Sequence, residues 1–320
     1  MSTFVRRKNA VDRPSGRAAL GFVGAVGIRR VSAALAGRYT VLKQLAGSGS
    51  AEFYLARPVG SGKGLVKIKV LAPRAACDSR KRELFRLEAR ASSKLDHGNI
   101  VRSSEAVVID SIHLCAIEHR PCVETLRDLI QRKGWLDLDH TVRIFNQIAG
   151  AVGHAHKSGI LHLRLSPDNV LIEPNGRVFV TDFGIEAGDE MAWAHRERSQ
   201  TSNATYVSVE QILDKALDQR SDIYALGLML YEMLTDRVPF ESPDTGYLKR
   251  QRVAHSPLPP LMLSTGVASE LSDIVMCLLE REPGGRPGRV EVVQRALTNL
   301  LKESEAAASQ GDDLTMSAAH

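Results

Sequence analysis

The sequence contains few cysteines and no metal-site pattern. Its four cysteines are scattered along 320 residues, at Cys77, Cys115, Cys122 and Cys277. The absence of a Cys-x-x-Cys pair argues against a disulfide framework or a zinc site and fits the reducing cytoplasm. The histidines form no ligand pattern either, since His154 and His156 stand two residues apart and do not share a helix face.

The sequence also lacks a hydrophobic run long enough to cross a membrane. The apolar run Ala18–Ile28 has about a dozen residues, whereas a membrane-spanning helix needs about 20. Arginines on both sides of this run leave two alternatives. One is a signal or targeting segment, and the other is a disordered basic extension that contacts acidic lipid or a partner. We expect the disordered extension, and we place it at residues 1–38.

Positive charge is concentrated in that leading segment. The chain carries a net charge of +5, but residues 1–38 hold eight Arg or Lys and a single acidic residue, Asp12. The remaining chain is therefore slightly acidic, and we expect no nucleic-acid partner for it. The apolar share of 43% and the charged share of 25% are ordinary for a globular protein.

Alternating apolar residues predict a small five-stranded sheet after the leading segment. The expected strands are 39–45, 53–56, 65–71, 107–109 and 113–117. One helical pattern interrupts them at 80–95. The Gly/Ser stretch 46–50 is expected to be the turn between the first two strands. This lobe ends near Glu118.

Helical patterns dominate the rest of the chain. We expect helices at 124–133, 139–157, 219–235, 245–254, 268–281 and 288–302, with a hairpin of strands at 170–172 and 178–181. The tail 302–320 is rich in Ala, Ser and Asp, and we expect it to be disordered. The predicted fold class is α+β, with a small sheet lobe followed by a larger, mainly helical lobe.

Several motifs resemble those of the protein kinases. The stretch His162–Ile172 and the tetrapeptide Thr181–Gly184 resemble the family's H-R-D-L-K-P-x-N and D-F-G motifs. His97–Val101 resembles H-P-N-I-V and Ser221–Gly227 resembles S-D-I-Y-S-L-G of the bacterial-type serine/threonine kinases. The resemblance covers residues 39–301. It implies a bilobal kinase fold with an N-lobe at 39–118, a hinge at 118–122 and a C-lobe at 123–301.

The resemblance also implies ATP and Mg²⁺ as cofactors and assigns residues to them. Lys69 stands at the position that contacts the nucleotide phosphates, with Glu88 as its expected ion-pair partner. Glu118 and Arg120 stand at the hinge that binds adenine through backbone groups. The metal ligands would be Asn169 and Asp182, whose oxygens suit Mg²⁺.

The phosphate loop departs from the family pattern. Its three glycine positions hold Ala46, Ser48 and Ala51, while Gly47 and Gly49 stand one place away from the first two. A Cβ atom hinders close phosphate approach, so we expect weakened ATP binding. Lys67 adds a second obstacle, because it shares a strand face with Lys69 and stands where the family has Ala above adenine. Its side chain either fills that space or bends out to water.

The catalytic loop lacks the family's proton-transfer residues. Arg164 stands at the position of the base Asp, Ser166 at that of the loop Lys, and Leu163 at that of the preceding Arg. A guanidinium stays protonated and cannot accept a proton. The threonine that contacts these residues in serine/threonine kinases is Asn203 here. No catalytic residue of this loop is intact.

Structural signatures of the family remain. Asp222 is expected to support the catalytic-loop backbone, and Glu210 to pair with Arg286 in a buried ion pair. His162 and Phe183 belong to an apolar stack in the family. Ser92 stands where the helix would contribute to that stack, so we expect a weak stack.

The sequence therefore predicts a pseudokinase that acts as a nucleotide-holding regulatory or binding module in the cytoplasm, with an unidentified protein partner. The alternative is a serine/threonine kinase with low ATP-dependent transfer, because the metal ligands and Lys69 remain. A third possibility is an adaptor tethered to a membrane or nucleic acid by its basic leading segment.

Overall fold

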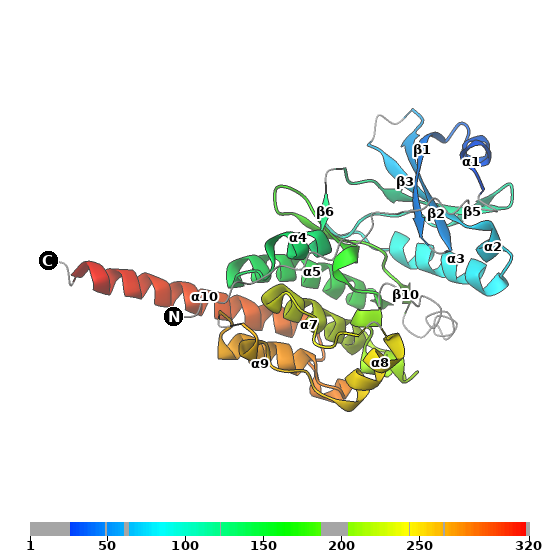
Figure 1. Ribbon diagram of the computed structural model, residues 1–320. Helices are drawn as coiled ribbons and strands as arrows, with labels where there is room; N and C mark the ends of the chain where they lie inside the picture. Colours follow the sequence, from blue (N-terminus) through cyan, green and yellow to red (C-terminus); the bar gives the residue numbers. More distant parts are fainter. Residues whose placement is uncertain are drawn as a thin grey trace, which may run out of the picture.

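Period-two alternation in the first part of the chain produces a five-stranded antiparallel sheet, which forms the smaller of two lobes (Figure 1). The computed structural model describes residues 26–48, 50–60, 64–121, 123–186, 204–242, 244–264 and 266–317. The strands lie in the order β1-β2-β3-β5-β4. Their bounds are β1 Tyr39–Ser48, β2 Ala51–Pro58, β3 Val66–Leu71, β4 Val107–Ile109 and β5 Ile112–Glu118. All five predicted strands are confirmed.

The two faces of this sheet have different covers. Ile68 and Val70 are fully buried on one face, in a cluster with Val31 of α1 (Ile28–Ala34) and with Leu35, which follows that helix. Leu71 packs on the other face, in a cluster that includes residues of α2 (Pro73–Ala76) and α3 (Ser79–Ser93). Strand alternation therefore directs Lys67 and Lys69 toward the α3 face, which borders the larger lobe.

The helix α1 corrects the prediction for the leading segment. Residues 26–38 are not a disordered extension, since Val26, Val31, Ala34 and Leu35 belong to the small-lobe core. The buried carboxylate of Glu52 accepts hydrogen bonds from the backbone N–H of Val26 at 3.1 Å and from the Tyr54 hydroxyl at 2.6 Å. Residues 1–25, and with them most of the predicted basic extension, lie outside the described residues.

The turn after β1 is tighter than predicted. β1 continues to Ser48, which pairs with Ala51, and a register irregularity lies between Leu45 and Ser48. Gly47 is therefore part of a strand, and a Cβ atom on it would lie 3.0 Å from the Ala51 carbonyl oxygen. Gly49 lies outside the described residues.

The larger lobe forms around two long helices, α5 (Leu138–Lys157) and α7 (Gln219–Thr235). Fourteen consecutive residues of α7, from Ser221 to Leu234, are buried. The other helices are α4 Leu126–Lys133, α6 Val209–Ile212, α8 Thr245–Ala254, α9 Ser269–Leu278 and α10 Val290–Ser317. The short strands are β6 Glu124–Thr125, β7 Ile160–Leu161, β8 Val170–Ile172, β9 Val178–Val180 and β10 Ile185–Glu186. All six predicted helices and the predicted hairpin are present.

The tail differs from the prediction as well. α10 runs to Ser317, so residues 302–317 continue a helix instead of being disordered, and Figure 1 shows this end projecting beyond the lobe. Alanine, glutamate and leucine in this stretch favour helix, and the start of α10 is anchored by the buried Val290, Val293 and Leu297. Within the described part of the chain, no helix has the length and apolar character needed to cross a bilayer.

Candidate active site

The backbone of the catalytic loop is held by one buried carboxylate. Asp222 accepts hydrogen bonds from the N–H groups of His162 at 2.8 Å and Leu163 at 2.6 Å, and it lies 2.8 Å from the Nε2 atom of His156. Leu163 adopts a left-handed conformation, with φ of 62°, which is costly for a residue with a branched side chain. The Asp222 contacts hold this conformation, and they confirm the predicted support of the loop backbone by Asp222.

The stack of His162 on Phe183 is also present. Their ring centroids lie 4.6 Å apart. Ser92 on α3, expected to weaken the stack, donates its hydroxyl to the Phe183 carbonyl oxygen at 3.1 Å. Gly184 passes so close to the loop that a Cβ atom would lie 2.5 Å from the His162 carbonyl oxygen. Local polar contacts therefore join α3 to the segment that follows Asp182.

Arg164 makes a contact that the sequence did not predict. Its Nη2 atom lies 2.8 Å from Oε1 of Glu88, while Nζ of Lys69 lies 3.7 Å from Oε2 of the same carboxylate. The predicted Lys69–Glu88 pair is thus present, but Glu88 is shared with the arginine at the base position. This arrangement extends the pair into a three-residue bridge from β3 through α3 to the catalytic loop.

The two predicted metal ligands lie in a strongly cationic setting. Asn169 donates its amide Nδ2 to the Arg164 carbonyl oxygen at 2.8 Å, and its Oδ1 is the atom that a metal ion would bind. Burial opposes ionisation of Asp182, but Lys69, Lys67 and Arg164 hold its pKa below the ordinary value. In the described part of the chain, no three His, Cys, Asp or Glu side chains gather as a metal site. Three cations in the field of Asp182 make this setting fit Mg²⁺ poorly.

Lys69 remains charged in this setting. Burial lowers its affinity for a proton, yet the carboxylates of Glu88 and Asp182 raise its pKa above the ordinary value. A recess beside it is lined by side chains from both lobes, among them Glu88, Ser92, Arg164 and Asp182. A cationic group at this position can attract phosphate.

Lys67 lies on the same side of the sheet as Lys69. Its Nζ atom stands 4.9 Å from the centre of the Phe53 ring, in a cation–π contact. Phe53 pairs with Lys69 on the neighbouring strand, so its ring and the Lys67 ammonium lie on the cleft side of the sheet. The contact with Phe53 therefore favours the alternative in which the Lys67 side chain stays in the cleft over the one in which it bends out to water.

The side chain of Arg120 makes contacts of its own, in addition to the backbone role expected at the hinge. Its guanidinium pairs with Glu118 at 3.0 Å and with Glu173 of the β8–β9 hairpin at 3.1 Å, and it stacks 3.7 Å from the centre of the Phe179 ring. The sequence suggested that side-chain identity matters little here. The pair of Arg120 with Glu173 is an ionic link between the hinge and the larger lobe, in addition to the pair of Arg164 with Glu88 between the two lobes.

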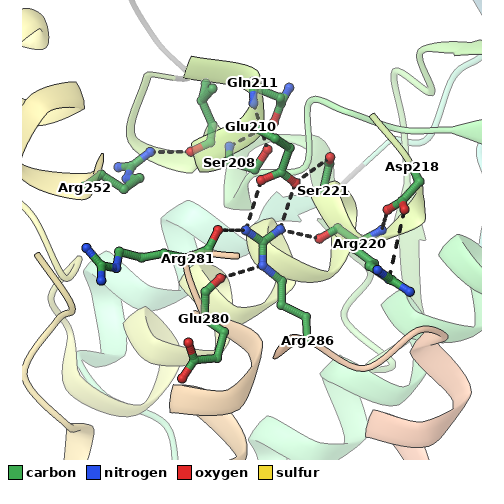
Figure 2. Close-up of polar contacts among 11 residues, drawn as sticks. Ser208, Glu210, Gln211, Asp218, Arg220, Ser221, Arg252, Glu280, Arg281 and Arg286 are labelled. Atoms are coloured by element: carbon green, nitrogen blue, oxygen red, sulfur yellow. Dashed lines mark hydrogen bonds and ion pairs between the residues drawn. The ribbon is translucent and has the colours of Figure 1, made fainter. Parts of the chain in front are cut away.

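The predicted buried pair of Glu210 and Arg286 is present (Figure 2). Nη1 and Nη2 of Arg286 lie 2.8 and 2.9 Å from the two carboxylate oxygens, and the Ser221 hydroxyl donates to Oε1 at 2.7 Å. Arg286 also donates to the carbonyl oxygens of Arg220, Glu280 and Arg281. Every donor of the guanidinium is directed at an acceptor, which offsets the cost of burying it.

A cluster beside the catalytic loop was missed by the sequence reasoning. Arg127 on α4 contacts the carboxylate of Glu232 and the Tyr206 hydroxyl, and it lies 3.6 Å from Asp168. Tyr206 in turn donates to Glu232. Arg127 and Glu232 are far apart in sequence and stand in no motif, so only the fold reveals the cluster. Asn203, predicted to contact the loop, lies outside the described residues.

Comparison with known proteins identifies the domain. A family model described as "Protein kinase domain" matches residues 39–298. The serine/threonine-protein kinase PrkC of Bacillus subtilis is 36% identical over 65% of this chain. A probable serine/threonine-protein kinase of Clostridium perfringens is 30% identical over 84% of it. The matches span 32% and 39% of the lengths of these two relatives.

Solved structures agree with these sequence relatives. A crystal structure of the PknI kinase domain of Mycobacterium tuberculosis superposes with a TM-score of 0.66 at 25% identity, covering 82% of this chain and 95% of that one. A second PknI structure gives a TM-score of 0.65 at 24% identity, over 82% of this chain and 96% of that one. The bilobal fold is therefore that of the kinases, and the chain belongs to the protein kinase family, alongside the bacterial serine/threonine kinases.

Proposed function

We propose that this chain is a pseudokinase, a kinase-fold regulatory module that holds a nucleotide and transfers phosphate poorly or not at all. The observation that carries this proposal is the ion pair of Arg164 with Glu88 at 2.8 Å. The side chain at the base position is committed to a carboxylate and offers a substrate hydroxyl no proton acceptor. Loss of a positioned base costs about 10²–10⁴-fold in rate, or roughly 3–5.5 kcal/mol of barrier.

Phosphate transfer tests the first half of this proposal. Radiolabelled ATP would be offered to the protein alone and with a generic basic substrate, and Asp182→Ala would serve as the control. We expect no transfer above that of Asp182→Ala. Transfer that disappears in Asp182→Ala would show an active enzyme and overturn the pseudokinase assignment.

Nucleotide binding tests the second half. The melting temperature would be measured with and without millimolar ATP, in the presence and in the absence of Mg²⁺. We expect ATP to raise it in at least one condition, since a ligand that binds the folded state stabilises it. Lys69→Met removes a cation of the recess and should abolish the shift. If ATP does not change the melting temperature of the unaltered protein, the protein does not hold a nucleotide and is a scaffold only.

A serine/threonine kinase of low activity is the second candidate. The Lys69–Glu88 pair and the His162–Phe183 stack favour it, because both are arrangements that phosphate transfer uses for positioning. The double change Arg164→Asp with Ser166→Lys would restore the family's loop residues. We expect it to raise transfer by about 10²-fold or more if the loop alone is limiting. An inert double variant that still binds ATP would show that the phosphate loop or Asn203 also limits transfer.

We infer a reducing cytoplasmic setting for this domain. The described cysteines Cys77, Cys115 and Cys277 are free thiols, which supports a compartment where disulfides do not form. Burial raises the pKa of the Cys115 thiol to about 11, so this residue lining the recess stays protonated. The protein partner is unassigned.

A further inference from the structure

Five charged side chains of the cleft have an unusual balance of signs. Lys67, Lys69 and Arg164 are cations, whereas Glu88 and Asp182 are the carboxylates that interact with them. Three positive charges therefore face two negative ones before any ligand binds. The next carboxylate along the loop, Asp168, is paired with Arg127 at 3.6 Å.

The geometry shows how these charges are shared. Lys69 and Arg164 approach the two different oxygens of Glu88, so one carboxylate serves two cations. Asp182 lines the same recess as Lys69 and Arg164, and Lys67 lies on the same side of the sheet as Lys69. A divalent cation at Asp182 and Asn169 would add two further positive charges to this group, at a distance where like charges repel strongly.

An anionic ligand gains from the same arrangement. The side chains of Arg164 and Lys69 are 30% and 18% exposed, so both reach the open space of the cleft. A guanidinium binds phosphate with two parallel N–H donors, and an ammonium binds it as a point charge. Both donor types are therefore present without a metal ion.

We propose that the cleft binds the triphosphate of a nucleotide without a divalent cation, because Arg164 and Lys67 supply the positive charge that Mg²⁺ would otherwise supply. This inference rests on one part of the proposed function, namely that the protein holds a nucleotide. It adds that Arg164, at the position of the catalytic base, is a binding residue. Asp182 then acts as an internal counterion of the cations and not as a metal ligand.

Calorimetric titration of the full chain with ATP tests this inference. One titration contains EDTA, and the other contains excess Mg²⁺. We expect the dissociation constant in EDTA to be equal to or lower than that in Mg²⁺. Arg164→Ala should weaken binding in EDTA by about tenfold, as expected for one charge-assisted contact, and Arg164→Lys should retain most of the affinity. Inorganic triphosphate in EDTA should displace ATP from the unaltered protein.

The control variant is Arg143→Ala. Arg143 is an exposed arginine on α5 that pairs with Asp139, so its removal should leave both dissociation constants unchanged. Binding that tightens tenfold or more on adding Mg²⁺ would overturn the inference while leaving the nucleotide-holding function intact. Equal affinity of Arg164→Ala and the unaltered protein in EDTA would overturn the role of Arg164. Absence of ATP binding in both titrations would overturn this inference and the nucleotide-holding function together.

Discussion

Arg164 changes the connections of the cleft as well as its chemistry. A neutral residue at this position would remove the base and leave Glu88 paired with Lys69 alone. The arginine instead adds a contact of 2.8 Å to Glu88 and lowers the pKa of Asp182 through its charge. Two residues that survive from the family pattern, Glu88 and Asp182, thus acquire Arg164 as a new charged neighbour.

At the scale of residues, the pair of Glu210 and Arg286 gives a sharp prediction for stability. Both side chains are almost completely buried. Arg286→Ala should lower the free energy of unfolding by about 3–5 kcal/mol, because Glu210 is left as an unpaired buried charge. Urea unfolding measures this loss. Arg289→Ala, on the exposed side of the same segment, should change it by less than about 0.5 kcal/mol. Similar losses in the two variants would contradict the role of the pair.

The carboxylate of Glu210 also predicts how the stability of the fold depends on pH. Burial opposes ionisation of Glu210, but hydrogen bonds from Arg286 hold its pKa below the ordinary value. A lowered folded pKa contributes stability that is present above the unfolded pKa, about 4.3, and is lost as pH falls through the folded pKa. Stability should therefore drop below about pH 4.3, and the drop should be shallower in Glu210→Gln. Urea midpoints between pH 6 and pH 3 measure it, with exposed Glu270→Gln as the matched control. Parallel curves for all three proteins would refute the assignment.

Individual contacts differ in how far the sequence reveals them. Lys69 with Glu88 and Glu210 with Arg286 were predicted because each residue stands in a motif with a known partner. The contact of Arg164 with Glu88 was not, because a residue that departs from its motif has no expected partner. The contacts of Arg120 and Arg127 depend on tertiary packing alone.

At the scale of elements, strong periodicity made the fold predictable. The bounds of α7 and α8 match the predicted helices, because apolar spacing and start signals agree there. The helix α1 was missed for physical reasons. It has seven residues, begins after Gly27 without a side-chain cap, and follows a basic stretch whose composition indicated disorder. Its stability comes from packing on the sheet, which sequence periodicity does not report.

Truncation distinguishes this helix from the residues before it. A variant lacking residues 1–38 loses Val31 and Leu35 from the face of the sheet that holds Ile68 and Val70. Each buried side chain of this size contributes about 1.5–3 kcal/mol, so we expect the free energy of unfolding to fall by about 3–6 kcal/mol. A variant lacking residues 1–25 keeps every described contact and should melt like the full chain. Thermal unfolding compares them, and equal melting temperatures would show that α1 does not stabilise the lobe.

At the scale of the whole molecule, the polar contacts that join the lobes include a backbone hydrogen bond between Val101 and Val180 and several side-chain links. Glu88 of α3 meets Arg164, Ser92 of α3 meets the Phe183 carbonyl, and the Arg120 guanidinium meets Glu173. The first of these side-chain links exists only because the base position holds an arginine. One of the contacts that join the lobes is therefore made by the side chain at the base position, and this contact favours a fixed relation of the two lobes.

A double-mutant cycle measures the strength of that link. The free energy of unfolding would be determined for the unaltered protein, Arg164→Ala, Glu88→Ala and the double variant. Because the pair is partly buried and shared with Lys69, we expect a coupling energy of about 0.5–2 kcal/mol. The exposed pair of Glu83 and Arg86 on the same helix provides a control cycle, for which about 0.2–0.5 kcal/mol is expected. If the effects of Arg164→Ala and Glu88→Ala simply add, the two side chains do not stabilise each other. Arg164 would then only replace the base, and other contacts would join the lobes.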